Sequence, residues 1–240
     1  MPENLFIPSV DLRIGSLEEY NRKQKEKAAL QHRKSKPRPC ITISREYGCE
    51  GYPVAERLRE LMMQKTGDEW VLIDKAVLEE VSRRHNISEA ILQTLGENNQ
   101  ILNEVLATFS PLWKSHHDYF KLLSRHVVAL AEQGNVIISE LGGAVITRHI
   151  EHSFHFRIYG SDAFKSATLA LRLNIEKTAA EKMMHHQQKA RDHFTRDFLN
   201  QDGHDSALFH ILFNNDRIDA GGIAHTIADF VLGRHDVRHI

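Results

Sequence analysis

The chain has 240 residues, of which 41% are hydrophobic and 26% charged, and its formal net charge at pH 7 is -1. A chain of this size can bury one sizeable core, and its near-neutral charge excludes a general electrostatic attraction to nucleic acid polymers or membrane surfaces. Two cysteines are too few for a disulfide framework and no apolar run approaches the roughly 20 residues of a membrane span, so we expect a cytoplasmic protein.

The first 39 residues differ in composition from the rest. Charges and glutamines dominate residues 18–36, and Pro37 and Pro39 break any helix that precedes them. We expect a charged N-terminal extension and linker over residues 1–39, solvated and containing at most one helix, and a single domain over residues 40–240. The basic cluster at residues 33–38 is more typical of a solvated charge run than of a binding site.

Residues 41–53 read as a buried strand, a glycine turn and a helix start. Gly48 and Gly51 would let the chain turn tightly with its amides pointing inward, and Pro53 suits a first helical turn. Such a turn can bind phosphate, because a helix N-terminus has unpaired N–H groups and the positive end of the helix dipole. However, the lysine of a Walker loop is absent: Tyr52 stands where a cation is expected, and Glu50 adds a negative charge.

From Cys40 onward, strand-like and helix-like stretches alternate, which predicts an α/β fold with a parallel sheet covered on both faces. The expected strands span residues 40–44, 70–73, 136–139, 154–159 and 208–213. The expected helices span residues 54–64, 76–84, 88–95, 113–133, most of 162–199, and 220–232. Ligands of such sheets bind beyond the carboxyl ends of the strands. Residues 44–52, Asp74, 139–143 and 160–162 should therefore converge on one crevice.

The residues at these strand ends resemble the cytidylate kinase-like family of P-loop nucleoside monophosphate kinases, from Cys40 to about Leu232. The resemblance is carried by ITISREYG, LIDKAVLEEV, VIISELGGAVI, FRIYGSDAF and KARDHFTRDF followed by LFHILFNNDRI. It implies a three-layer P-loop sandwich with a helical nucleotide-monophosphate arm and a helical lid at about residues 176–206. The implied reaction is transfer of the ATP γ-phosphoryl group to CMP or dCMP with Mg²⁺.

The resemblance also implies roles for particular residues. The positions implied to hold the ATP phosphates are Ser44, Gly48, Cys49, Glu50, Gly51 and Tyr52. Those implied for the acceptor nucleotide are Asp74, Glu140, Lys165 and Arg172. Catalytic cations are needed because phosphoryl transfer depends mainly on positioning and charge neutralisation, and the implied set is Arg45, Lys189, Arg191 and Arg196. The last three belong to the lid. No residue is assigned as a metal ligand.

Structural explanations stand beside these roles. Arg45 could pair with Glu46 or with a neighbouring acid, Asp74 could cap a helix, and the cations of residues 165–196 could form solvated helix faces. Glu140 falls where the family pattern commonly carries an arginine, while Thr168 and Gln188 also replace charged residues. Two functions therefore remain: a nucleoside monophosphate kinase, or a catalytically impaired nucleotide-binding or protein-interaction module on the same scaffold.

The 16 histidines suggest a third possibility, metal-dependent hydrolysis, only weakly. The adjacent pairs are His116-His117 and His185-His186. Adjacent histidines point about 100° apart on a helix, so neither pair suits one metal ion. Packed or solvated histidines are the favoured interpretation.

Overall fold

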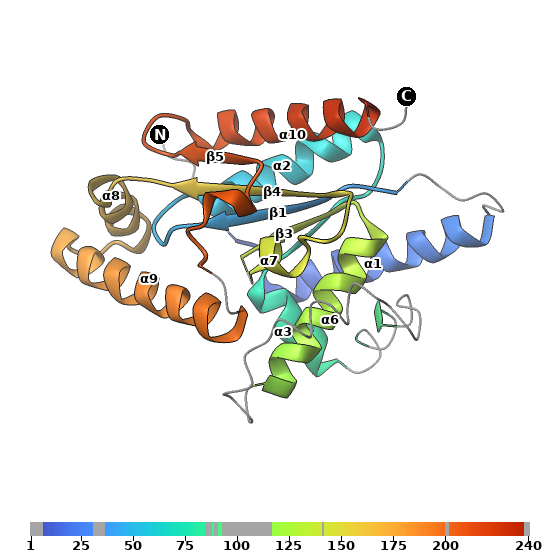
Figure 1. Cartoon of the computed structure of the whole chain (residues 1–240), viewed down its shortest axis with the longest axis horizontal. Helices are drawn as coiled ribbons and strands as arrows, with labels where there is room; N and C mark the ends of the chain where they lie inside the picture. Colours follow the sequence, from blue (N-terminus) through green and yellow to red (C-terminus); the bar gives the residue numbers. More distant parts are fainter. Residues whose placement is uncertain are drawn as a thin grey trace.

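The computed structural model describes residues 7–30, 37–84, 88, 91–92, 117–140, 142–199 and 202–237. Its centre is a five-stranded sheet in the order β2-β3-β1-β4-β5, and every pair of neighbouring strands is parallel (Figure 1). The strands are β1 (Cys40–Arg45), β2 (Val71–Ile73), β3 (Val136–Ser139), β4 (Ser153–Tyr159) and β5 (Ile211–Asn214). Most of the helix expected over 88–95, and the start of the one expected over 113–133, lie outside the described residues.

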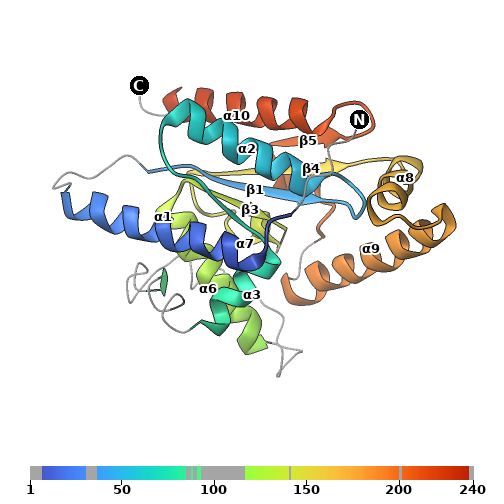
Figure 2. The ribbon, with the colours of Figure 1, turned by 180° about the vertical axis from the view of Figure 1, so that it is seen from behind.

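Helices cover both faces of the sheet, as Figures 1 and 2 show from opposite sides. One face is covered by α2 (Gly51–Thr66) and α10 (Ala220–Val237). The other face is covered by α1 (Val10–Leu30), α3 (Lys75–Arg83), α6 (His117–Gln133) and the short α7 (Gly143–Ile146). Beyond the carboxyl end of β4 lie α8 (Asp162–Leu173) and α9 (Lys177–Leu199). The expected α/β fold with a parallel sheet is confirmed.

Two apolar cores, one on each face, follow from the two-residue period of the strands. In β3, Val136 and Ile138 join the core under α1, α3 and α6, whereas Ile137 joins the core under α2 and α10. Both faces are apolar because both are covered, which is typical of parallel sheets. None of the helices in the described part of the chain is long and apolar enough to cross a membrane.

The N-terminal helix α1 is part of this core. Ile14, Leu17 and Tyr20 are no more than 2% exposed, and the Tyr20 hydroxyl donates a hydrogen bond to the carbonyl of Gly134. The expectation that residues 1–39 are solvated is therefore wrong for α1, because three apolar side chains of its inner face pack against α3 and β2. A domain boundary at residue 40 stays a prediction.

The strand expected over residues 208–213 is wrong at its start. Leu208 ends a 3₁₀ helix (Ser206–Leu208), whose N-cap Asp205 accepts a hydrogen bond from the amide of Ala207 at 2.9 Å. This cap stabilises the 3₁₀ turn over residues 206–208, so β5 begins only at Ile211.

Candidate functional site

The loop between β1 and α2 forms the centre of the site, at the carboxyl end of β1. The amide of Glu46 donates to the carbonyl of Ile158 at 3.0 Å, which ties the loop to β4, and the amide of Cys49 donates to the carbonyl of Glu46 at 3.1 Å. Gly48 has a φ of +103°, and a Cβ at this position would lie 2.7 Å from the Cβ of Lys165. Glycine is therefore required both by the turn and by the close approach of α8.

The start of α2 has backbone N–H groups that the hydrogen bonds of the helix itself do not use. Glu50 is the N-cap residue, but its side chain makes no capping hydrogen bond; instead, its amide donates to Asn215 Oδ1 at 2.9 Å and its Oε2 accepts from Asn215 Nδ2 at 3.2 Å. The next two amides, those of Gly51 and Tyr52, have no partner within the helix because they lie in its first turn. These two N–H groups and the helix dipole favour an anion.

Two arginines from different elements meet at one carboxylate beside this helix start. Glu140 Oε1 lies 2.6 Å from Arg45 Nη2, and Glu140 Oε2 lies 3.1 Å from Arg191 Nη2. The Arg191 guanidinium also stacks on the ring of Tyr47, 5.1 Å from its centroid. The structural alternative that Arg45 pairs with an acid is therefore confirmed, with Glu140 rather than Glu46 as the partner. We call Arg45, Glu140 and Arg191 the arginine bridge.

The charges of the arginine bridge keep Glu140 ionised. Burial would raise the pKa of Glu140, but the nearby charges of Arg45 and Arg191 outweigh burial and hold this pKa below its ordinary value. Burial lowers the pKa of Arg191, and repulsion by Arg45 lowers it further. The carboxylate thus stabilises two guanidinium groups that would otherwise repel each other.

Arg45, rather than Tyr52, supplies a cation at the start of α2. A Cβ on Gly51 would lie 2.1 Å from the Cδ of Arg45, so only glycine lets this arginine cross the helix start. Tyr52 is 9% exposed and belongs to the core under α2 and α10. Its hydroxyl has no hydrogen-bond partner among the described residues, and burial raises its pKa. Tyr52 thus contributes a backbone amide and a packed ring to the site.

A second charged cluster lies on the β4 side of the loop. Lys165 is 8% exposed, and its Nζ lies 2.8 Å from Glu46 Oε2 and 3.0 Å from Asp162 Oδ1. Glu46 Oε1 also lies 3.8 Å from Nη2 of the buried Arg157. Burial would lower the pKa of Lys165, but its bonds to Glu46 and Asp162 outweigh burial and raise this pKa. The lysine is therefore charged, yet already paired.

Glu46 and Arg157 were not assigned to the site from the sequence. An arginine between Phe156 and Ile158, inside an otherwise apolar strand, is the signal that could have identified Arg157. In the register of β1 and β4 it lies opposite Ser44, at the same end of the sheet. Glu46 gave no comparable signal, because a charge in a glycine turn is ordinary.

Helix α9 contacts the loop directly. Gln188 Oε1 accepts a hydrogen bond from the amide of Tyr47 at 2.8 Å, and Tyr47 packs against the small apolar core formed by Leu169, Ala180 and Met184. The loop, α8 and α9 thus form one packed unit with the arginine bridge at its edge.

The other expected site residues differ in their surroundings. Cys49 is fully buried, and burial, followed by the charge of Glu46, raises the pKa of its thiol to about 12. Lys189 and Arg196 are exposed on α9 and make no ion pair with any residue that the structure describes. Arg172 is exposed on α8; its pKa is lowered by partial desolvation and then by the charge of Arg45, which places it near the arginine bridge.

Asp74 lies at the carboxyl end of the edge strand β2. It caps α3 by accepting a hydrogen bond from the amide of Val77 at 3.0 Å, so the capping explanation is confirmed. Its other oxygen pairs with Arg13 of α1, a contact that sequence reasoning missed. Within the described ranges, no group of three or more histidine, cysteine, aspartate or glutamate side chains is arranged to hold a metal ion.

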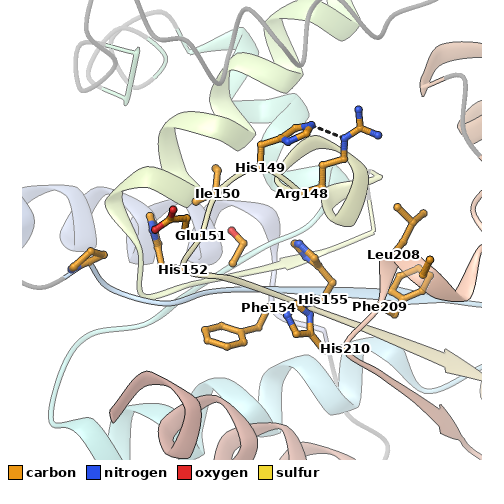
Figure 3. Close-up of a pocket in the computed structure, with 13 residues that line it drawn as sticks. Arg148, His149, Ile150, Glu151, His152, Phe154, His155, Leu208, Phe209 and His210 are labelled. Atoms are coloured by element: carbon orange, nitrogen blue, oxygen red, sulfur yellow. Dashed lines mark hydrogen bonds between the residues drawn. The ribbon is translucent and has the colours of Figure 1, made fainter. Parts of the chain in front are cut away.

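A cavity of about 930 Å³ lies at the amino end of β4, the opposite end of the strand from the loop (Figure 3). Some of its polar groups already bond within the protein: Arg148 Nε donates to His149 Nε2 at 2.7 Å, and His155 Nδ1 lies 2.9 Å from Thr42 Oγ1. Free donors and converging cations lie instead at the carboxyl ends of the strands, and we place the candidate site there.

Comparisons with known proteins show the fold and the family of the chain. A crystal structure of an uncharacterized protein from Eubacterium ventriosum ATCC 27560 superposes with a TM-score of 0.62 at 19% sequence identity, covering 82% of this chain and 99% of that chain. At this identity the likeness concerns the fold alone. The comparison with curated proteins gave no match. The model of the cytidylate kinase-like family matches residues 40–217, which include the loop, the arginine bridge and α9. The chain therefore belongs to the cytidylate kinase-like family.

Proposed function

We propose that the protein is a nucleoside monophosphate kinase that transfers the ATP γ-phosphoryl group to CMP or dCMP. The observation that carries this proposal is the convergence of Arg45 and Arg191 on one anionic group beside the free amides at the start of α2. Two guanidinium groups and a helix N-terminus around one position suit a phosphoryl group better than any neutral ligand. Family membership supports the same reaction class.

The proposed mechanism assigns neutralisation of charge to these groups. The amides of Gly51 and Tyr52 would hold phosphate oxygens of ATP, and Arg45 and Arg191 would contact the phosphoryl group in flight, where its charge spreads over the equatorial oxygens. Mg²⁺ would neutralise part of the charge of the ATP phosphates. It would arrive bound to ATP rather than to the protein, because the carboxylates of Glu140 and Asp74, which could otherwise bind it, are already paired with arginines.

The acceptor nucleotide would lie beside the loop. We propose that Asp74 lines its position from the β2 side of the loop, and that Lys165 and Arg172 of α8 line it from the β4 side. The nucleotide-monophosphate arm that the resemblance implies falls outside the described residues. Helix α9 would act as the lid, bringing Arg191 to the phosphates and placing Lys189 and Arg196 over them. A lid excludes water, which would otherwise compete with the acceptor. Free nucleotides as substrates fit a cytoplasmic location.

One observation favours the second candidate, a nucleotide-binding or protein-interaction module with impaired catalysis. The buried and partly buried cations of the crevice are already paired with carboxylates of the chain: Arg45 and Arg191 with Glu140, and Lys165 with Glu46. A phosphate must displace or share these partners, which lowers the charge available to the transition state.

A coupled assay of ADP release, run with CMP, dCMP, UMP and AMP, tests the proposed reaction beside calorimetry of ATP with Mg²⁺. We expect turnover with a cytosine nucleotide and its loss by at least about 100-fold in Arg191→Ala, since removing a group aimed at the transition state costs that much. Arg57→Ala, at an exposed site on α2, is the matched control. ATP binding without turnover of any acceptor would favour the impaired module instead.

A further inference from the structure

In the arginine bridge, two guanidinium groups bind one carboxylate, as two arginines commonly bind one phosphate group. Glu140 Oε1 lies 2.6 Å from Arg45 Nη2, and Arg191 Nη2 lies 3.2 Å from the same oxygen and 3.1 Å from Oε2. Arg45 is the last residue of β1, and Arg191 belongs to α9. The three side chains are only 12% to 28% exposed, so solvent screens the contacts incompletely. The chain's own anion therefore occupies the position at which two cations converge.

The backbone at Glu140 suggests that this placement is not incidental. Its φ is +73°, in the left-handed region that costs free energy for any residue with a Cβ. Its amide donates to the carbonyl of Ile43 at 2.9 Å and its carbonyl accepts from Gly143 at 3.0 Å, which fixes the strained residue at the exit of β3. A strained residue held by its surroundings is a reason to look for a function.

A second side-chain oxygen, that of Gln188, contacts the loop in a comparable way. Gln188 Oε1 accepts the hydrogen bond of the Tyr47 amide at 2.8 Å, and this amide belongs to the loop that binds phosphate under the proposed function. Gln188 and Arg191 are three residues apart on α9, so they lie on the same side of the helix. Together they dock α9 onto the loop.

We propose that Glu140 and Gln188 are internal substitutes for phosphate oxygens that hold α9 against the loop, and that a phosphate-bearing ligand must displace them to bind. This inference rests on the proposed function, because it assumes that the loop binds phosphate. The oxygens of Glu140 and of the ligand compete for the same two guanidinium groups. The carboxylate therefore weakens ligand binding while it keeps Arg45 and Arg191 in position.

Whether one substitution at Glu140 raises or lowers the affinity for a phosphate ligand separates this role from a purely structural one. Glu140→Gln keeps the shape and the left-handed backbone but removes the negative charge. If Glu140 competes with phosphate, the variant binds inorganic pyrophosphate and Mg²⁺-ATP about tenfold more tightly than the wild type, as expected when one ion-paired competitor is lost. If Glu140 only positions the arginines, the variant binds both ligands more weakly.

Isothermal titration calorimetry with pyrophosphate and Mg²⁺-ATP measures this difference. Glu60→Gln, which removes an exposed carboxylate from α2, is the matched control and should bind as the wild type does. Equal or weaker binding by Glu140→Gln would overturn the proposal while leaving the proposed function intact. Absence of binding to the wild type, to Glu140→Gln and to the control alike would overturn the proposed function as well.

Amide hydrogen exchange gives a second readout that does not depend on catalysis. The Tyr47 amide should exchange at least about tenfold faster in Gln188→Ala than in the wild type, because its acceptor is gone, and pyrophosphate should restore its protection. Unchanged exchange of Tyr47 in the free variant, or failure of saturating pyrophosphate to protect it, would contradict the assignment of Gln188 as an internal substitute.

Discussion

Gly48 allows the loop to lie directly on α8. Its φ of +103° lies in the left-handed region, and its α-carbon faces the backbone of Lys165 so closely that an added Cβ would lie 2.7 Å from the Lys165 Cβ and 2.9 Å from the Lys165 carbonyl oxygen. The same approach brings Lys165 to Glu46. One glycine thus joins the turn of the loop to the charged cluster beside it.

Gly48→Ala should lower the free energy of unfolding by about 2–4 kcal/mol, the sum of left-handed strain and overpacking. Urea denaturation measures the change. Gly67→Ala separates the two terms, because Gly67 also has a positive φ (+68°) but nothing lies within 4 Å of its added Cβ. The control should lose only about 1–2 kcal/mol. Equal losses in the two variants would mean that contact with α8 adds nothing at Gly48.

At the level of single residues, the sequence allowed the loop to be located but not its partners. Gly48 and Gly51 follow an apolar strand, and this local pattern indicates a turn into a helix. The pairing of Arg45 with Glu140 depends instead on the register of β1 against β3, which brings together residues far apart in the chain. Local patterns carry no such register, so the sequence predicted an acidic partner for Arg45, either Glu46 or a neighbouring acid, but did not identify Glu140.

Among the elements, α1 shows what a compositional argument misses. Its surface is rich in charge, yet Ile14, Leu17 and Tyr20 form a narrow apolar stripe that is almost fully buried. The stripe has helical spacing, but the charged residues around it dominate the average hydropathy of the segment. Composition alone therefore favoured a solvated extension.

Leu17→Ala should destabilise the whole protein by about 2–5 kcal/mol, because Leu17 is 0% exposed and its truncation would leave a cavity between α1 and the core. Leu12→Ala is the matched control on the same helix: Leu12 is 68% exposed, and its truncation should change stability by less than about 0.5 kcal/mol. Thermal and urea unfolding measure both variants. If Leu17→Ala behaved like Leu12→Ala, α1 would be a detachable extension after all.

The bounds of the strands were predicted with different success. β3 was predicted residue for residue, because four apolar or small residues lie between the Gly134-Asn135 turn and a charged residue. β5 was predicted three residues too early because Leu208 and Phe209 extend the apolar pattern, although the Asp205 cap makes them part of a turn. Apolar runs indicate that a strand exists better than they indicate where it begins.

At the scale of the whole molecule, helices cover both faces of the sheet, so a titratable side chain on a central strand becomes buried. His155 lies in β4 and is 6% exposed, with Nδ1 2.9 Å from Thr42 Oγ1 of β1. Burial, and then the neighbouring His210, lowers the pKa of His155 from 6.5 to about 3. The folded protein therefore excludes a proton that the unfolded chain accepts.

Acid should consequently destabilise the fold through His155. Between pH 6.5 and about 3 the unfolded chain binds a proton at this residue and the folded chain does not, so stability falls as the pH falls, by up to about 1.4 kcal/mol per pH unit. His155→Gln keeps a polar partner for Thr42 but cannot titrate, so its stability should fall less steeply over this range. Urea unfolding at a series of pH values measures the slope. His225→Gln, at an exposed site on α10, is the matched control and should retain the wild-type slope. A slope in His155→Gln as steep as that of the control would show that other groups cause the acid sensitivity.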